Sequence, residues 1–270
     1  MEESRRGRLE GKRAVVIGAG QTPGLGTGIG RAAALTFARE AATVMLIDRD
    51  PGSVEDTRSI IEREGGSATV FLADVTDESA CRAIAEVAFQ RMGGVDILFD
   101  GVGTHGPGRP DEVAEETWDL VMNVNLKAKW LVTKYIAPIM VKQRAGSIIY
   151  VSSVAALRDG ALRGTATPYA VSKAGVDRLA ITVAAAYAEY DVRANSILPG
   201  LIDTPMAIDS VLAKSGLSRE EAVAARLRSV PMSYTADAFD IAYAALYFAS
   251  DESRYVSGQC LAVDGARGAT

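Results

Sequence analysis

Along the chain, short and almost wholly apolar segments alternate with longer segments in which apolar residues recur at helical spacing. The short segments predict β-strands at residues 14–18, 43–48, 68–74, 95–101, 147–152, 193–198 and 259–263. The longer segments predict helices at residues 29–39, 53–64, 78–92, 112–142, 168–189 and 236–250. Strands that are apolar throughout are covered on both faces. The alternation therefore predicts an α/β fold, a doubly wound parallel sheet of about seven strands with helices on both faces.

The composition is that of an ordinary globular protein, with 48% hydrophobic and 23% charged residues in 270. No Pro- or Ser-rich linker and no repeat divides the chain, so we expect one domain over residues 1–270, with tails at 1–8 and 267–270. The net charge of −5, without a basic cluster, argues against binding to nucleic acid or to an anionic membrane.

The chain has too few histidines and cysteines for a histidine cluster, a zinc site or a disulfide framework. His105 is the sole histidine, and Cys81 and Cys260 are too far apart in sequence for a zinc pattern. The first residues hold no apolar stretch of the kind found in a secretory signal, and no apolar run approaches the ~20 residues that span a bilayer. We expect a cytoplasmic protein without a metal site.

Glycines gather after the first predicted strand, between Gly18 and Gly30, where the next helix begins. Gly18, Gly28 and Gly30, with Ile29 between the last two, allow the backbone to turn sharply and to approach a pyrophosphate at the helix N-terminus. Such a loop also occurs as a plain turn, but its place between a strand and a helix favours a dinucleotide site.

Acidic residues end the next two predicted strands. Asp48 lies 18 residues past Gly30, near the ~20-residue spacing of a ribose-binding carboxylate, although it could instead cap the next turn. A carboxylate there repels the 2′-phosphate of NADP, so NAD is predicted even though Arg49 is adjacent. Asp74 and Val75, and Gly101 after the fourth strand, stand either beside a cofactor or in strand-end turns.

Tyr169 and Lys173 form the more specific signal, because they lie one turn apart on one helix face. Thr167 is the expected N-cap of that helix and Pro168 its first residue. An ammonium group beside a phenol favours the phenolate, so we expect a lowered Tyr169 pKa and an acid–base role. On its own such a pair is usually a solvated helix face. Here Ser152 and Ser153 end a neighbouring strand.

These motifs, in this order and spacing, resemble the short-chain dehydrogenase/reductase family from about residue 9 to 265, a single Rossmann-like domain. The resemblance rests on the glycine loop, Asp48, Asp74-Val75, Asn125, Ser153, Tyr169-x-x-x-Lys173, Pro199-Gly200 and the closing segment 258–265. It implies that Tyr169 exchanges a proton with the substrate, Ser153 orients the reacting oxygen, Lys173 lowers the Tyr169 pKa and holds the nicotinamide ribose, and Asn125 holds a water. It places the cofactor against Gly18, Gly28, Ile29, Gly30, Asp48, Arg49, Asp74, Val75, Gly101, Tyr169, Lys173, Pro199, Gly200, Ile202 and Thr204.

Three features depart from the family pattern. Nine residues separate Gly18 from Gly28, a longer loop than usual. Asp100 stands where the family usually has asparagine. The interval between Ser153 and Tyr169 is also long, and the inserted Arg158 and Arg163 either point to solvent or bind an anionic group on the substrate.

The sequence thus predicts an NAD-dependent oxidoreductase that interconverts a secondary alcohol and a ketone, with residues 200–235 as a substrate-binding lid. The alternatives are an NADPH-dependent carbonyl or 3-oxoacyl-type reductase, and a non-catalytic NAD-binding regulator. A sugar-nucleotide epimerase is disfavoured, because little chain is left for a second substrate domain. The helix at 168–189 is apolar almost all round, which predicts a homotetramer or homodimer.

Overall fold

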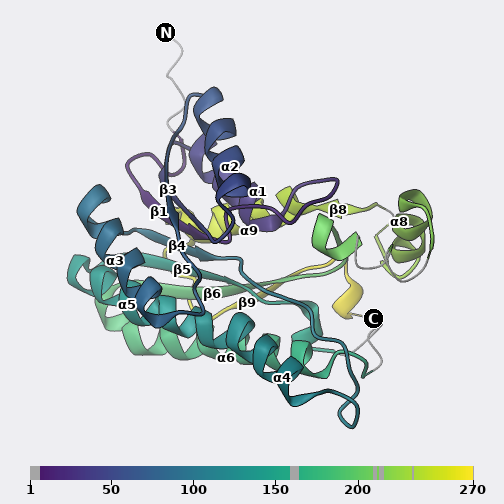
Figure 1. Ribbon diagram of the computed structural model, residues 1–270. Coiled ribbons are helices and arrows are strands. Elements are labelled where there is room, and N and C mark those ends of the chain that lie inside the picture. Colours follow the sequence, from purple (N-terminus) through teal and green to yellow (C-terminus); the bar gives the residue numbers. More distant parts are fainter. Residues whose placement is uncertain (1–6, 159–163, 209–211, 213–215, 233, 270) are drawn as a thin grey trace.

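The computed structural model of the protein describes residues 7–158, 164–208, 212, 216–232 and 234–269. Its centre is a sheet of seven parallel strands in the order β3-β2-β1-β4-β5-β6-β9, which confirms the predicted doubly wound fold (Figure 1). The strands are β1 (Arg13–Ile17), β2 (Thr43–Asp48), β3 (Ser67–Leu72), β4 (Ile97–Asp100), β5 (Gly146–Val151), β6 (Val192–Pro199) and β9 (Cys260–Val263).

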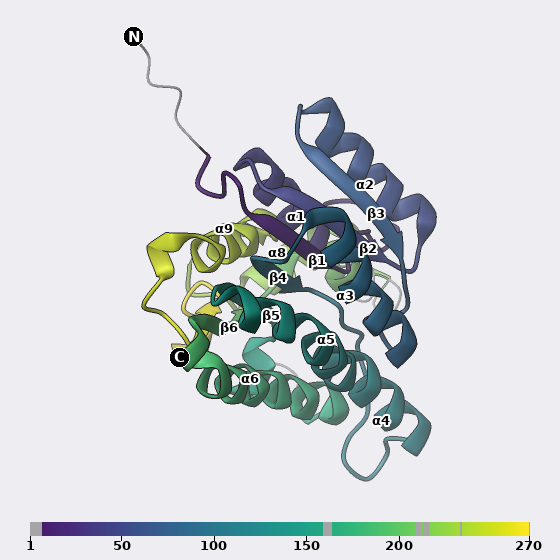
Figure 2. The same cartoon turned by 90° about the vertical axis from the view of Figure 1, so that its left-hand side faces the viewer.

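Helices cover both faces of the sheet and enclose two apolar cores (Figure 2). One core packs α1, α2 and α9 against the sheet, and the other packs α3, α5 and α6 against the opposite face. The helices are α1 (Ile29–Arg39), α2 (Pro51–Arg63), α3 (Glu78–Met92), α4 (Glu115–Met122), α5 (Ala128–Gln143), α6 (Thr167–Tyr187), α8 (Arg219–Leu227) and α9 (Ala238–Ala249). Both faces of each inner strand are therefore buried, as the apolar strand pattern predicts.

The strand order reverses at β1, which pairs with β2 on one side and with β4 on the other. The chain that leaves β1 continues to β2 on one side, and the chain that leaves β4 continues to β5 on the other side. A crevice therefore opens between these two connections, beyond the carboxyl ends of β1 and β4. Ligands of open α/β sheets bind in such a crevice. The loops that follow β1, β2, β4, β5 and β6 all reach this edge of the sheet.

The predicted helix at residues 112–142 is not continuous. The structure has α4, then a π-helical segment at Asn123–Lys127, and then α5. The wider turn accommodates Asn125, whose amide side chain bonds the backbone of Thr104 instead of facing solvent. Single π turns inside α-helices often mark functional sites.

The start of α6 also differs from the prediction. The helix begins at Thr167, and the residue before it, Ala166, provides no side-chain cap. Pro168 falls in the first turn, where its missing N–H has no consequence. The N-terminal amides of α6 are therefore not held by the threonine hydroxyl that the sequence suggested.

The segment between β6 and α9 contains secondary structure that the periodicity did not reveal. It holds α8 and a two-residue parallel pairing between β7 (Ile202–Asp203) and β8 (Ala236–Asp237), and α8 projects beyond the sheet (Figure 1). Ser218 and Glu221 form a capping box at the start of α8.

Near the N-terminus, Arg8 forms an ion pair with Glu252, and Leu9 is fully buried. Near the C-terminus, the backbone N–H groups of Arg267 and Gly268 bond the backbone carbonyl and the side chain of Asp264. No helix in the described part of the chain is long and apolar enough to cross a membrane.

The close approach of α1 to β1 depends on Gly30, because a Cβ there would clash with the carbonyl oxygen of Gly18. At Gly28 the nearest atoms to a built Cβ are 3.9 Å away, which is ordinary contact. Gly30→Ala should therefore lower the free energy of unfolding by about 1–3 kcal/mol through overpacking. Gly28→Ala should lower it by less, about 0.5 kcal/mol, because Gly28 is the N-cap of α1, where alanine is less favourable than glycine. Urea unfolding without cofactor measures both, and equal stabilities would contradict the packing argument.

Candidate active site

Four of the side chains predicted to act in catalysis meet at the carboxyl edge of the sheet. Ser153 follows β5, Tyr169 and Lys173 lie on the first turns of α6, and Asn125 lies in the π-helical segment. A Cβ built on Gly103, in the loop after β4, would lie 3.2 Å from Lys173 Nζ and 3.4 Å from Asn125 Oδ1. The fold thus brings together residues that are far apart in sequence.

Tyr169 is half-buried and forms a side-chain hydrogen bond with Ser153. The Ser153 Oγ also accepts a hydrogen bond from the backbone of Ala155 at 3.2 Å, which fixes its position. The His105 ring lies against the Tyr169 ring, with 5.1 Å between centroids. Two hydroxyl groups of different acidity therefore stand side by side where the crevice ends.

Lys173 is almost fully buried, and its Nζ donates to the carbonyl oxygen of Val151 at 3.0 Å. Burial disfavours the ammonium form and lowers the Lys173 pKa to about 7. The positive charge of Lys129 lowers it further, while Asp100 and Asp177 oppose the shift.

The predicted lowering of the Tyr169 pKa by Lys173 is not found in this structure. Burial raises the Tyr169 pKa, and the hydrogen bond with Ser153 is the influence that opposes the rise. The reason is that Lys173 Nζ bonds a carbonyl oxygen, lies 5.6 Å from the centre of the tyrosine ring and loses its own proton near neutral pH.

Asn125 is fully buried and joins the loop after β4 to α6. Its Oδ1 accepts from the Thr104 N–H at 2.7 Å, and its Nδ2 donates to the Thr104 carbonyl and to Ser172 Oγ, each at 3.0 Å. Both amide protons are used, and one lone pair of Oδ1 remains for a water.

The residues around the glycine loop fit a dinucleotide. Gly18 has a φ of +77°, which favours glycine, and the loop leads into the N-terminus of α1. Asp48 stands at the end of β2, and its carboxylate accepts from the backbone N–H groups of Gly20 and Asp50 at 2.8 and 3.1 Å. Held in this way, the Asp48 carboxylate keeps lone pairs for ribose hydroxyls.

The added residues of the glycine loop fold back on Gln21. Its side chain donates to the Gly26 carbonyl at 2.9 Å and accepts from the Gly28 N–H at 3.1 Å. Its backbone exchanges hydrogen bonds with the Ser53 hydroxyl at the start of α2. The long loop is thus a turn held by hydrogen bonds of the Gln21 side chain, an arrangement that the spacing of the glycines alone does not reveal.

Arg49 and Asp74 lie at the ends of neighbouring strands and approach each other to 3.8 Å. Hydrogen bonds from Thr76 lower the Asp74 pKa, and Arg49 adds to the effect. Val75 is buried, and the Gly101 N–H bonds the carbonyl of Ile17, which ties the loop after β4 to β1. These positions follow the ends of their strands, and their contact with a cofactor stays a prediction.

On the other side of the crevice, the Gly200 N–H bonds the Val263 carbonyl at 3.0 Å, which fixes the turn after Pro199. Ile202 and Thr204 are buried. Asp203 forms an ion pair with Arg219 of α8, and the second terminal nitrogen of Arg219, Nη1, is buried without a hydrogen-bond partner among the described residues.

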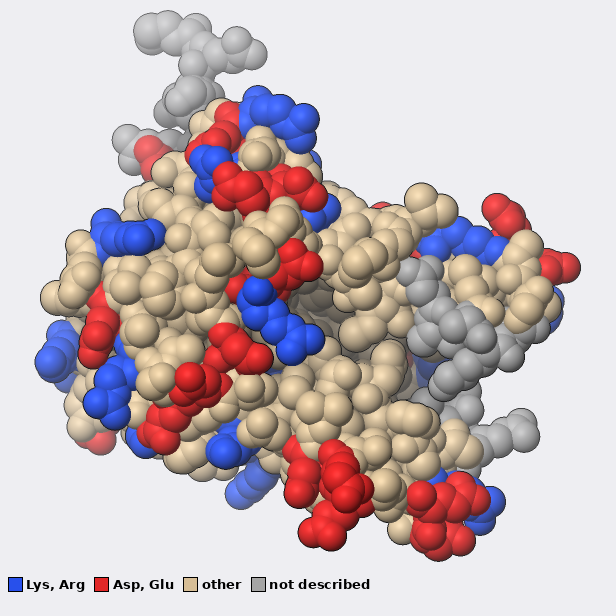
Figure 3. Space-filling model, viewed as in Figure 1, with Lys and Arg blue, Asp and Glu red and all other residues tan. Residues whose placement is uncertain are grey.

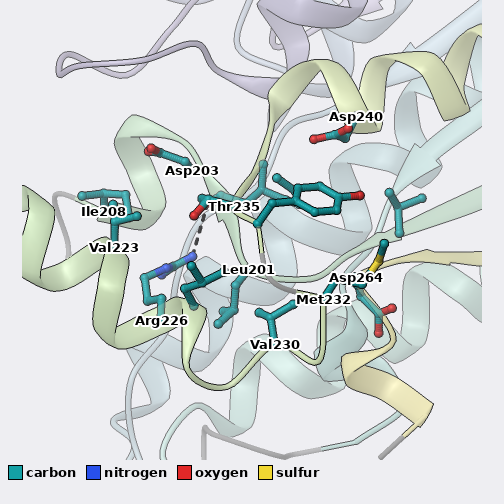
Figure 4. Close-up of a pocket in the computed structure, with 16 residues that line it drawn as sticks. Leu201, Asp203, Ile208, Val223, Arg226, Val230, Met232, Thr235, Asp240 and Asp264 are labelled. Atoms are coloured by element: carbon teal, nitrogen blue, oxygen red, sulfur yellow. Dashed lines mark hydrogen bonds between the residues drawn. The ribbon is translucent and has the colours of Figure 1, made fainter.

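A cavity of about 70 Å³ lies beneath α8, and no catalytic candidate lines it (Figure 4). Arg226 reaches across it and donates to the carbonyl oxygen of Ile202. The other labelled lining residues are Leu201, Asp203, Ile208, Val223, Val230, Met232, Thr235, Asp240 and Asp264. Ser153 and Tyr169 are not among the residues that line this cavity.

Acidic and basic side chains are interspersed on the face of the molecule in Figure 3, without a continuous basic patch. Among the described residues, no group of three or more His, Cys, Asp or Glu side chains could hold a metal ion. Both cysteines are free thiols.

A family model described as Enoyl-(Acyl carrier protein) reductase matches residues 24–267 of the chain. The chain is also 35% identical to the 3-oxoacyl-[acyl-carrier-protein] reductase FabG of Thermotoga maritima, over 96% of this chain and 98% of that protein. The chain belongs to the short-chain dehydrogenase/reductase family. Membership makes it an oxidoreductase that binds a nicotinamide dinucleotide.

Other members of this short-chain dehydrogenase/reductase family are similar along the whole chain. The family's rat member named Dehydrogenase/reductase SDR family member 6 is 35% identical over 96% of this chain and 98% of its own length. A Burkholderia xenovorans protein assigned to the family has a TM-score of 0.91 at 39% identity, covering 98% of this chain and 99% of that one. Levodione reductase has a TM-score of 0.90 at 26% identity, covering 97% and 99%.

Two arginines that the sequence analysis singled out are not placed in the candidate site, and two residues that it did not single out contact or influence the site. Arg158 is exposed, and residues 159–163, which include Arg163, lie outside the described part of the chain. Sequence reasoning missed Lys129, whose charge affects Lys173, and Ser172, which bonds Asn125. Lys127 and Lys134 lie close to Lys129 in the same stretch, so the sequence carried no signal that distinguished Lys129 from its neighbours.

Proposed function

We propose that this short-chain dehydrogenase/reductase is an NAD-dependent enzyme that interconverts a secondary alcohol and a ketone. The observation that carries the proposal is the hydrogen bond between Tyr169 and Ser153 beside the buried Lys173, at the ligand-binding edge of the sheet. A phenol and a serine hydroxyl that share one hydrogen bond can bind the same substrate oxygen from two sides.

In this mechanism the bound nicotinamide supplies or accepts the hydride. Tyr169 donates its phenolic proton to the carbonyl oxygen during reduction and removes it during oxidation. Ser153 donates a hydrogen bond to the same oxygen and stabilises the charge that develops there. Since the Tyr169 pKa is raised in the free protein, the phenol holds its proton and is ready for the reductive direction.

Lys173 and Asn125 support the tyrosine. Lys173 would hold the nicotinamide ribose, and with a pKa of about 7 it can both accept and release a proton near neutral pH. Asn125 would bind a water through its free lone pair and connect Lys173 to solvent.

The choice of NAD rests on Asp48 and its surroundings. Its carboxylate would accept hydrogen bonds from the adenosine ribose hydroxyls and repel a 2′-phosphate. Arg49, the basic residue nearest in sequence, approaches Asp74. The hollow beside the glycine loop is lined by Asp50 and Asp56 as well as by Arg31, so it holds no excess of positive charge for a phosphate.

A second candidate is an NADPH-dependent carbonyl or 3-oxoacyl-type reductase, favoured by the similarity to FabG of Thermotoga maritima. A non-catalytic NAD-binding regulator is disfavoured, because such a protein has no need of the complete set of Ser153, Tyr169, Lys173 and Asn125. A panel of alcohols, ketones and 3-oxoacyl thioesters, assayed with both cofactors, separates the candidates. We further propose one domain over residues 1–270, a lid at residues 200–235 and a cytoplasmic location.

Tyr169→Phe should lower turnover by about 100-fold or more, because it deletes the transferable proton and keeps the ring packing. Cofactor affinity, measured by fluorescence titration, should stay within a few-fold of wild type. The matched control is Tyr243→Phe on α9, an exposed tyrosine on the opposite face of the sheet from α6, and it should keep normal turnover. Near-normal turnover of Tyr169→Phe would remove this residue from the mechanism.

Asp48→Ala should narrow the preference for NAD⁺ over NADP⁺ by about tenfold or more, since it removes both ribose hydrogen bonds and the repulsion of a phosphate. The ratio of kcat/KM values for the two cofactors measures this. Asp251→Ala, which removes an exposed aspartate that pairs with Lys12 and does not line the hollow beside the glycine loop, should leave the ratio unchanged. A wild-type protein at least as efficient with NADP⁺ would overturn the assignment.

We propose a homotetramer that assembles through α5 and α6. Trp130 on α5 and Ile181 on α6 are 47% and 37% exposed, so apolar surface on these helices is uncovered in the single chain. Light scattering at micromolar concentration should give a multiple of the 28.4 kDa subunit mass. Ile181→Arg should shift the assembly toward smaller species, whereas Phe89→Arg on exposed α3 should not, and a monomeric wild type would refute the proposal.

A further inference from the structure

Asp100 and Lys129 form an ion pair in the interior of the protein. Lys129 Nζ donates to Asp100 Oδ1 at 2.6 Å and to the Asp100 carbonyl at 2.9 Å, and neither side chain has any exposed surface. Asp100 Oδ2 is buried without a hydrogen-bond partner among the described residues. Buried pairs of this kind add little stability compared with apolar residues of similar size, so stability alone does not explain the pair.

The pair connects α5 to the loop that borders the active site. Asp100 Oδ1 also accepts from the Val102 N–H at 3.2 Å. Two residues further on, Thr104 bonds Asn125 through both its N–H and its carbonyl group. The carboxylate of Asp100 therefore anchors the first part of the loop and Asn125 the last, and Gly103 between them passes close to Lys173 Nζ.

The pair is also close enough to Lys173 to act on its charge. Asp100 at the end of β4 pairs in register with Tyr150 of β5, and the next β5 residue, Val151, binds Lys173 Nζ. Lys129 and Asp100 both shift the Lys173 pKa, and the lowering by Lys129 is the larger of the two. The other ionisable groups around Lys173 are Asp177 and Tyr169 on its own helix, with the His105 ring stacked on the tyrosine.

We propose that the buried Asp100–Lys129 pair is a positioning pair for Lys173, which fixes the loop at residues 101–104 and sets the charge that Lys173 carries near neutral pH. Burial is the larger cause of the lowered Lys173 pKa, and the pair adds to it because the lowering by Lys129 exceeds the opposing effect of Asp100. This inference rests on the proposed function for its catalytic meaning, although the charge on Lys173 can be measured without turnover.

The test follows the ¹³Cε chemical shift of Lys173 during a pH titration of the full-length protein, with the signals assigned from Lys173→Met and Lys129→Gln. In wild type the signal should titrate near neutral pH, as the Lys173 pKa of about 7 requires. In Lys129→Gln, which keeps a donor for Asp100 but no charge, the Lys173 pKa should rise by about one unit or more. The rise is expected because the positive charge of Lys129, the largest lowering influence on the Lys173 pKa after burial, is gone.

A double variant and a matched control complete the design. Asp100→Asn with Lys129→Met removes both charges without leaving one unpaired, and it should also raise the Lys173 pKa. The control replaces the part-buried pair at the opposite edge of the sheet, Arg13→Met with Asp96→Asn, and should lower stability without moving the Lys173 titration. Circular dichroism and thermal unfolding establish that each variant is folded.

The proposal is overturned if Lys173 titrates at its ordinary value in wild type, or if its pKa is unchanged in either folded variant. The readout also separates this proposal from the proposed function. A raised Lys173 pKa in a protein that oxidises no alcohol would retain the pair's role and refute the enzyme assignment. An active enzyme in which the Lys173 pKa is unchanged by the loss of the pair would retain the enzyme assignment and refute the pair's role.

Discussion

The burial of Lys173 is the constraint on which the chemistry of this protein depends. A lysine ammonium in the interior is unfavourable unless it has partners, and here its hydrogen bond goes to the Val151 carbonyl at the end of β5. The result is a lysine with a pKa of about 7 beneath a tyrosine that keeps its proton. In the proposed mechanism the two groups act as a proton reservoir and a proton donor, and neither would do so on an exposed helix face.

The sheet makes this arrangement possible by bringing separate loops to one edge. β1, β4, β5 and β6 are adjacent and parallel, so the residues that follow them meet within one crevice. Asn125 then ties the loop after β4 to α6, and the π turn that carries Asn125 is the local distortion needed for that contact. The backbone thus brings the residues of the candidate site together, and side-chain hydrogen bonds then fix their positions.

Much of the fold could be predicted because local signals agree with the final packing. α3 has the predicted bounds, since Asp77 caps its start and Gly93 ends it in a left-handed conformation. The π turn at Asn125 and the fold of the long glycine loop could not be predicted, because both depend on contacts with distant residues. Both the capping box before α8 and the amphipathic pattern of this short helix were readable from the sequence, although the segment is polar overall. The predicted direction of the Tyr169 pKa shift was wrong, because the spacing of residues in the sequence indicates which side chains are neighbours but not how deeply they are buried.

The central claim is that one crevice holds a dinucleotide between Asp48 and the Tyr169–Lys173 pair. A crystal structure of the protein with NAD⁺ tests this most directly. The account predicts the adenosine ribose hydroxyls at hydrogen-bond distance, about 2.6–3.2 Å, from the Asp48 carboxylate. It also predicts the nicotinamide ribose at Lys173 and the ring beside Tyr169. A cofactor bound elsewhere, or one whose nicotinamide lies away from Tyr169, would contradict it.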